Sequence, residues 1–344
     1  MTRKFTLSDF DYHLPEDMIA QYPAEKREKS KLMIVDRPSK SIQIDTFENI
    51  ISYLDKDDIL VMNETKVIPA RLLGKKPTGG KIEVLILEQV DEHTWKCLVK
   101  PGRRLKVGSE MILGNVLHGK IIEWGEQGER VIRFSYEGDF FSIIDKIGKM
   151  PLPPYIKREA TELDAARYQT VFADKNGSVA APTAGLHFTD DIFKNLHGKG
   201  LEKAKVNLRI GLDTFRPVTT EKIEDHTMHT EYCEIPKHSA KKINRARQSG
   251  KRVVALGTTS VRTLESFAKD GILTSGEMHT DIFIYPGYTF KMVDVMITNF
   301  HLPRSTLLML VSAFAGYELI MKAYHTAIEN NFRFYSYGDA MVIL

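Results

Sequence analysis

The sequence has little cysteine, little net charge and no long apolar run. Its 344 residues include two cysteines, Cys97 and Cys233, which stand far apart and lack the spacing of metal ligands. This pattern argues against a zinc ribbon or a disulfide framework and is typical of a reducing cytoplasm. The longest uncharged apolar stretch, Ser305 to Ala315, is shorter than the roughly 18 residues that a membrane helix needs. Since the first residues form no apolar signal segment, we expect a cytoplasmic protein without a membrane partner.

The formal net charge of +3 neither requires nor excludes a nucleic-acid partner, but the basic residues gather in two places. Lys100, Arg103 and Arg104 surround a Pro-Gly pair. A second run, between residues 237 and 252, contains Lys241 and Arg245 and no acidic residue. Such a run is usually a solvated helix face, but concentrated positive charge can also follow a phosphate backbone. We therefore regard these five side chains as candidates for phosphate contacts.

The length exceeds the size at which one hydrophobic core stops growing, so two domains are expected. Residues 1–65 read as mixed α/β. Residues 66–152 contain short β-rich runs punctuated by glycine and proline, which are typical of a small barrel or sandwich. A stiff proline-rich exit follows at 150–156, and the α/β texture returns over 153–344. The sequence therefore predicts a large mixed α/β domain with an inserted small β-barrel domain.

Periodicity within the second α/β part predicts alternating helices and strands. The expected helices are Asp190 to Gly198, His238 to Ser249, Val261 to Lys269 and Thr306 to Ile320, and the expected strands are Arg252 to Leu256, Asp281 to Tyr285 and Val295 to Thr298.

Small residues from Gly177 onward lead into His187, Phe188 and a helix. Thr183 and Gly185 lie in this segment, where small side chains allow close approach of the backbone to a ligand. His187 could act as an acid or base, and Phe188 could offer a stacking face. From spacing alone, a turn and helix cap with a structural histidine is the favoured interpretation.

Two further corners join an apolar strand to a helix. One runs through Gly257, Thr258, Thr259 and Ser260, where free N–H groups at a helix start suit a carboxylate or phosphate. It matches neither the Walker loop nor the G-x-G-x-x-G fingerprint, and a plain capped helix is an equal alternative. The other, from Asn299 to Ser305, contains a histidine at position 301. Ligands bind at the carboxyl ends of parallel strands, so two such corners in one domain predict a shared pocket.

A third histidine-bearing segment contains His226, His229 and Glu231. The spacing differs from the H-E-x-x-H pattern of a helical zinc site, and no further ligand cluster is evident. Acid/base chemistry or hydrogen bonding to a ligand is the better functional interpretation, with surface histidines as the alternative. We expect no metal.

Long segments resemble the S-adenosylmethionine:tRNA ribosyltransferase-isomerase family over essentially the whole chain. The matching segments are Asn63 to Arg71, Leu98 to Gly102, Pro151 to Ile156, Arg167 to Ala173, A-P-T-A-G-L-H-F-T from Ala181, G-T-T-S-V-R-T-L-E-S from Gly257, the segment Thr298 to Gly316, and Phe332 to Met341. The chain departs from the family pattern at Arg209-Ile210, where His-Val is usual, and at Asp213, where glycine is usual.

The resemblance implies a large α/β domain with an inserted small β-barrel. The sequence does not determine the oligomeric state, for which we favour a monomer. The resemblance also implies an enzyme that transfers the ribosyl part of S-adenosylmethionine to 7-aminomethyl-7-deazaguanine at the tRNA wobble position, giving epoxyqueuosine and releasing adenine and methionine. The acid/base candidates are then His187, His229, Glu231 and His301. The substrate-binding candidates are Thr183, Gly185, Phe188, Gly257, Thr258, Thr259, Ser260, Tyr285, Asn299 and Ser305, of which Phe188 and Tyr285 are the stacking candidates. The candidates for binding the tRNA anticodon arm are Lys100, Arg103, Arg104, Lys241 and Arg245.

Two other functions remain open. A conventional S-adenosylmethionine-dependent RNA methyltransferase would normally have a glycine-rich loop after its first strand, which we do not find. A non-catalytic RNA-binding protein would explain the basic turns but not the histidine-bearing loops.

Overall fold

A nine-stranded mixed sheet forms the centre of the larger part of the protein. The computed structural model describes residues 3–125, 128–211 and 218–344. Along the sheet the strands are β18 (Gly276–Thr280), β14 (Glu231–Ile235), β13 (Glu202–Leu208), β3 (Asp58–Asn63), β15 (Arg252–Leu256), β19 (Val295–Asn299), β20 (Ala340–Ile343), β1 (Lys31–Asp36) and β2 (Ser41–Thr46). The four central strands β13, β3, β15 and β19 are parallel, so their carboxyl ends share one edge.

Both faces of this sheet are covered, which explains the continuous apolar runs in its central strands β3 and β15. Every residue of β3 is buried. Since successive strand residues point to opposite faces, Ile59 and Val61 join one core and Leu60 and Met62 the other. The first core also includes residues of α4 (Lys237–Gln248), α5 (Thr258–Phe267), α6 (Thr306–Ala315) and α7 (Tyr317–Glu329). The second includes residues of α3 (Asp190–Gly198) and a 3₁₀ helix at Phe47–Ser52.

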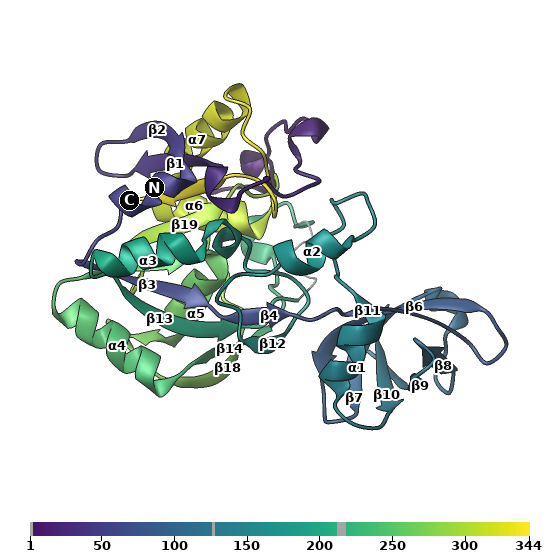
Figure 1. Ribbon diagram of the computed structural model, residues 1–344. Coiled ribbons are helices and arrows are strands. Elements are labelled where there is room, and N and C mark those ends of the chain that lie inside the picture. Colours follow the sequence, from purple (N-terminus) through teal and green to yellow (C-terminus); the bar gives the residue numbers. More distant parts are fainter. Residues whose placement is uncertain (1–2, 126–127, 212–217) are drawn as a thin grey trace.

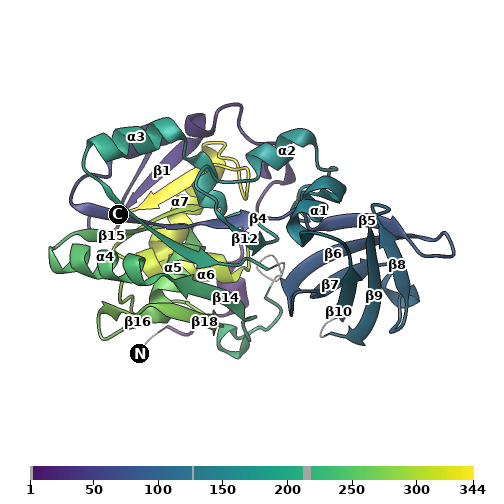
Figure 2. The ribbon, with the colours of Figure 1, turned by 60° about the horizontal axis from the view of Figure 1, so that its bottom comes forward.

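A closed antiparallel barrel lies beside this α/β part (Figures 1 and 2). Its strands are β5 (Arg71–Lys75), β6 (Lys81–Gln89), β7 (Thr94–Lys100), β10 (Arg130–Ser135), β9 (Leu117–Trp124) and β8 (Glu110–Leu113), in that order, and pairing of β8 with β5 closes the ring. The helix α1 (Phe140–Ile147) and the short strand β11 (Gly148–Lys149) follow. The predicted fold class, an α/β domain with a small β-barrel, is therefore confirmed.

A small two-stranded sheet lies where the chain passes from the α/β part to the barrel. Strand β4 (Thr65–Val67) leads from β3 toward the barrel and pairs in parallel with β12 (Lys175–Ser178). The helix α2 (Glu162–Arg167) lies between the barrel exit and β12 in the chain. All strands of the barrel sheet fall within Arg71–Lys149. The exact domain limits of 1–65, 66–152 and 153–344 stay a prediction.

Two expected elements differ from the structure. The helix expected from Thr306 to Ile320 is two helices, because Gly316 adopts a positive φ of 90° and the helix axes differ by 116°. The strand expected at Asp281 to Tyr285 is wrong. Pairing with β14 ends at Thr280, after which the chain leaves the sheet edge and buries Ile284 in the core. Among the described residues, no single helix is both long and apolar enough to cross a membrane.

Candidate functional site

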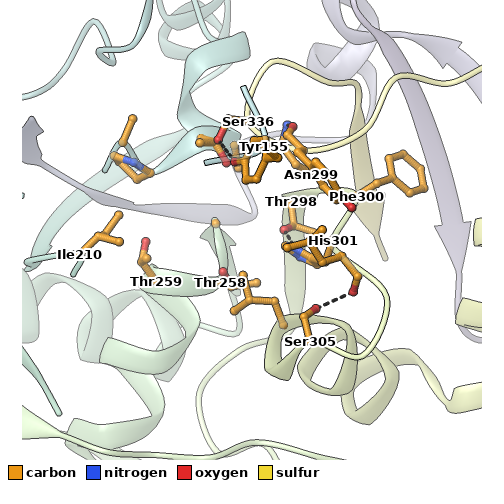
Figure 3. A pocket seen from close by; sticks show the side chains of 18 residues that line it. Tyr155, Ile210, Thr258, Thr259, Thr298, Asn299, Phe300, His301, Ser305 and Ser336 are labelled. Carbon is orange, nitrogen blue, oxygen red and sulfur yellow. Dashed lines mark hydrogen bonds between the residues drawn. The ribbon is translucent and has the colours of Figure 1, made fainter. Parts of the chain in front are cut away.

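A pocket lies where β15 and β19 end (Figure 3). It contains about 680 Å³ of atom-free space, counting its open mouth. All three corners that the sequence indicated contribute to it. The predicted site residues that line it are Thr183, Gly257, Thr258, Thr259, Asn299, His301 and Ser305.

The start of α5 supplies backbone N–H groups on one side of the pocket, and these have no partner among the described residues. Gly257 begins the helix with a positive φ of 84° and donates its N–H to Ile297 O at 2.7 Å. No side chain caps the helix, and the Thr259 hydroxyl, which is buried, has no partner within the described chain. Helix N-termini of this kind bind carboxylates and phosphates. Ser260 does not take part, because its hydroxyl donates to Leu256 O at the end of β15.

The corner after β19 holds His301 firmly. Its backbone N–H donates to the Tyr324 hydroxyl at 2.9 Å, and the Tyr12 hydroxyl donates to its carbonyl. Its Nε2 lies 3.0 Å from the Thr298 hydroxyl. Burial lowers the pKa of His301 to about 3, so the imidazole is neutral at pH 7. Ser305 also lines the pocket, but its hydroxyl caps α6 by accepting from Leu308 N at 3.2 Å.

His187 lies behind the pocket wall rather than in it. Its Nε2 is 3.2 Å from Asn299 Nδ2, and its ring packs at 5.0 Å from the ring of Phe47. Burial, together with the positive charges of Arg333 and Arg27, lowers the pKa of His187 to about 3. The ring lines a second, smaller cavity, which shares Ser336 with the first. His187 therefore does not touch a ligand in the main pocket directly, but it contacts Asn299, which lines that pocket.

Two predicted ligand contacts near His187 have packing roles instead. Phe188 is fully buried, and its ring lies 5.1 Å from the rings of both Phe47 and Phe193. Gly185 is small because a Cβ atom there would come within 2.7 Å of Phe172. Neither residue lines the pocket, so the expected stacking face at Phe188 has no place in this site.

Three other candidates also lie outside the pocket lining. Glu231 is buried in an ion pair with Arg262 and accepts from Gly211 N at 3.3 Å. Tyr285 packs against Phe283, with 4.9 Å between the rings. His229 is half-buried and precedes β14 in the chain. Asp213, where the chain departs from the family pattern, lies outside the described residues.

The two groups of basic candidates lie far apart. Lys100, Arg103 and Arg104 are exposed at the end of β7 and in the turn after it, on the barrel. Lys241 and Arg245 are exposed on α4, which lies on the side of the α/β part away from the barrel in both views (Figures 1 and 2).

Sequence reasoning missed most of the apolar lining. The aromatic rings of Tyr155 and Tyr335 lie 4.7 Å apart and form one wall. The other missed residues are Ala181, Pro182, Ala184, Ile210, Thr298, Phe300, Leu302, Leu307 and Ser336. Tyr155 and Tyr335 lie in segments that carry the family resemblance, which was the one available signal for them. Among the described residues, no group of three histidine, cysteine or acidic side chains is arranged to hold a metal ion.

A pocket with helix-end donors, a neutral histidine and aromatic walls at the carboxyl edge of a parallel sheet is typical of α/β proteins that bind a small polar ligand. The chain belongs to the queuosine biosynthesis protein family, whose model matches residues 7–343.

Relatives of the same family extend over the whole chain. A protein of Natranaerobius thermophilus named S-adenosylmethionine:tRNA ribosyltransferase-isomerase is 52% identical over 341 residues, 98% of this chain and 99% of its own. A protein of the same name from Thermoanaerobacter is 52% identical over 340 residues, with the same coverage. The crystal structure of S-adenosylmethionine tRNA ribosyltransferase from Thermotoga maritima is 39% identical, covers 98% of this chain and 100% of its own, and has a TM-score of 0.56.

Proposed function

We propose that the chain is an S-adenosylmethionine:tRNA ribosyltransferase-isomerase. It transfers the ribosyl moiety of S-adenosylmethionine to 7-aminomethyl-7-deazaguanine at the tRNA wobble position, isomerises it to give epoxyqueuosine-tRNA, and releases adenine and methionine. The observation that carries this proposal is the full-length membership of the family, with relatives of that name at 52% identity. A conventional methyltransferase and a non-catalytic RNA-binding protein are not favoured.

The methionine end of S-adenosylmethionine fits the start of α5. A carboxylate there accepts hydrogen bonds from the free backbone N–H groups of the first helical turn and from the Thr259 hydroxyl, which has no partner among the described residues. Gly257 and Thr258 line the pocket at the same corner. This end of the pocket therefore anchors the co-substrate away from the reacting carbon.

His301 is the acid/base group that the pocket favours. The sulfonium acidifies the neighbouring 5′ hydrogens, and a base within hydrogen-bond reach can remove one. The imidazole of His301 is neutral in the free pocket, since burial keeps its pKa near 3, and Thr298 and two tyrosine hydroxyls fix its position. A held base of this kind loses little entropy on reaching the reactive geometry.

The aromatic wall suits the flat and the cationic parts of the co-substrate. Tyr155 and Tyr335 present tilted rings with centroids 4.7 Å apart. Such rings stack on adenine or contact a sulfonium through their electron-rich faces. We assign to these two residues the stacking role that the sequence suggested for Phe188 and Tyr285.

The remaining predicted site residues lie outside the lining of the main pocket. His187 acts through Asn299, since it does not line the pocket. Glu231 and His229 lie outside the pocket lining, and catalytic roles for them stay predictions. Contacts with the tRNA anticodon arm fall to the exposed Lys100, Arg103 and Arg104 on the barrel, or to the exposed helix α4. A cytoplasmic location and a monomeric state also stay predictions.

Product analysis tests the function. The purified chain, given S-adenosylmethionine and tRNA bearing 7-aminomethyl-7-deazaguanine, is expected to release adenine and methionine and to add no methyl group. Mass spectrometry of the digested tRNA distinguishes epoxyqueuosine from a methylated base. Detection of S-adenosylhomocysteine in place of free adenine would overturn the proposal.

Substitution of the histidine tests the site. His301→Ala is expected to slow turnover by about 10²- to 10⁴-fold, because positioned acid/base groups contribute that much, and to leave tRNA affinity nearly unchanged. His325→Ala, at an exposed position on α7, is the matched control and is expected to retain wild-type turnover. Equal rates for the two variants would remove His301 from the mechanism.

A further inference from the structure

The side-chain amide of Asn299 can take only one orientation. Its Nδ2 lies 3.1 Å from Tyr335 O, 3.4 Å from Asp339 O and 3.2 Å from His187 Nε2. The two backbone carbonyls can only accept hydrogen bonds, so the nitrogen of the amide must face them. Exchanging the amide nitrogen and oxygen would bring an oxygen against two carbonyl oxygens.

His187 contributes to the same constraint. His187 Nε2 can accept a hydrogen bond from Asn299 Nδ2 only if Nε2 carries no proton. The ring must therefore be neutral and protonated on Nδ1. The surroundings favour the neutral ring, since burial and the nearby Arg333 and Arg27 disfavour an imidazolium. His187 is therefore a positioning residue for the amide.

This arrangement leaves Asn299 Oδ1 as an acceptor without a partner. Asn299 is 3% exposed and lines the main pocket, and its Oδ1 has no hydrogen bond from any described residue. A buried acceptor without a donor is destabilising, and a ligand that supplies the donor relieves this cost. Because the oxygen is shielded from water in the free protein, the ligand must displace part of the pocket lining to reach it.

We propose that Asn299 Oδ1 accepts a hydrogen bond from an amino group of the substrates, so that the pocket selects a donor at this point and rejects an acceptor. This inference rests on the proposed function. The donor is one of the three amino groups on the parts of the substrates that are released or modified: the 6-amino group of adenine, the α-amino group of methionine, or the aminomethyl group of the deazaguanine. All three share the chemistry that Oδ1 requires.

Paired ligands distinguish these sources by binding alone. S-Adenosylhomocysteine is compared with its 6-oxo counterpart and with its counterpart lacking the α-amino group. An anticodon stem-loop with 7-aminomethyl-7-deazaguanine is compared with the same RNA carrying the 7-cyano base. The wild-type chain is expected to bind the amino form about 10- to 100-fold more tightly in at least one pair, in titration calorimetry. The pair that shows the preference identifies the source.

Variants then assign the preference to Asn299. In Asn299→Ala, the preference is expected to fall to within about twofold, as only the bonded amino group loses its acceptor. His187→Gln, which keeps an acceptor for Nδ2, is expected to retain most of the preference, whereas His187→Leu, in which only the two backbone carbonyls hold the amide, is expected to reduce it. A residue with only a packing role would change thermal stability in both His187 variants without separating them in ligand preference.

Two outcomes overturn the inference. One is a wild-type chain that shows no preference in any of the three pairs, a measurement that requires no variant to fold. The other is a folded Asn299→Ala chain that keeps the full preference. Failure of the proposed function is a separate result, because it is detected as an absence of adenine release by the wild-type chain with S-adenosylmethionine and tRNA.

Discussion

Acidification below pH 6.5 is expected to destabilise the protein through two buried histidines. His187 and His301 have pKa values of about 3 in the folded chain, against about 6.5 when exposed. A lowered folded pKa stabilises the fold above the unfolded value, and this stabilisation is lost as the pH falls toward the folded value. Between pH 7.5 and pH 5, each histidine binds a proton only in the unfolded chain, which costs about 2 kcal/mol, or about 4 kcal/mol for both.

Denaturant unfolding at a series of pH values measures this loss. Carboxylates contribute little above pH 5, so histidines dominate the slope in this range. His187→Gln and His301→Gln are each expected to reduce the pH-dependent loss by about half, whatever they do to stability at pH 7.5. His325→Gln, at an exposed position, is the control and is expected to leave the slope unchanged. The reasoning is refuted if both buried-site variants keep the wild-type slope, or if NMR shows either ring titrating near pH 6.5.

Three further predictions concern RNA binding and two buried carboxylates, Glu265 and Asp164. Replacing Arg103 and Arg104 by alanine is expected to weaken tRNA binding and to reduce the slope of log affinity against log salt by about one per lost phosphate contact. An unchanged slope would show that this turn does not contact the phosphates of the tRNA. Glu265→Ala is expected to cost about 3 kcal/mol or more, since its carboxylate accepts from one hydroxyl and three backbone N–H groups; a melting temperature equal to wild type would contradict this. Asp164→Ala is expected to lower the free energy of unfolding by about 3–5 kcal/mol, because the guanidinium of Arg158 loses its carboxylate partner; a loss below about 1 kcal/mol would contradict this.

The polypeptide's local pattern was enough to predict the architecture. Strands such as β3 and β15 read as apolar runs because both of their faces are covered, and the barrel strands read as short runs between glycine and proline turns. The break at Gly316 was not predicted, because the apolar pattern of α6 continues into α7 across the glycine. The strand expected at 281–285 was not found, because the side chains there pack on the core without joining the sheet edge.

The site was only partly predictable for a different reason. Residues at strand-to-helix corners, such as Gly257 and Asn299, are placed by local structure, and a sequence pattern can indicate them. Tyr335 and Ile210 reach the pocket because strands distant in the chain are neighbours in the sheet, which no local pattern encodes. The direction in which His187 faces is decided by tertiary packing against Phe47.

Hydrogen bonds connect the segment that leaves the barrel to the pocket wall. The segment that leaves the barrel contributes Tyr155, whose hydroxyl is hydrogen bonded to the Ser336 hydroxyl in the pocket lining. A few residues later, Arg158 forms a bidentate pair with the buried Asp164, and the Tyr337 hydroxyl donates to that carboxylate at 2.7 Å. These bonds hold the pKa of Asp164 well below its usual range, so the carboxylate stays charged and the network stays closed at physiological pH. The wall that carries Tyr155 and Ser336 is thus fixed from the barrel exit on one side and from the strand that begins at Ala340 on the other.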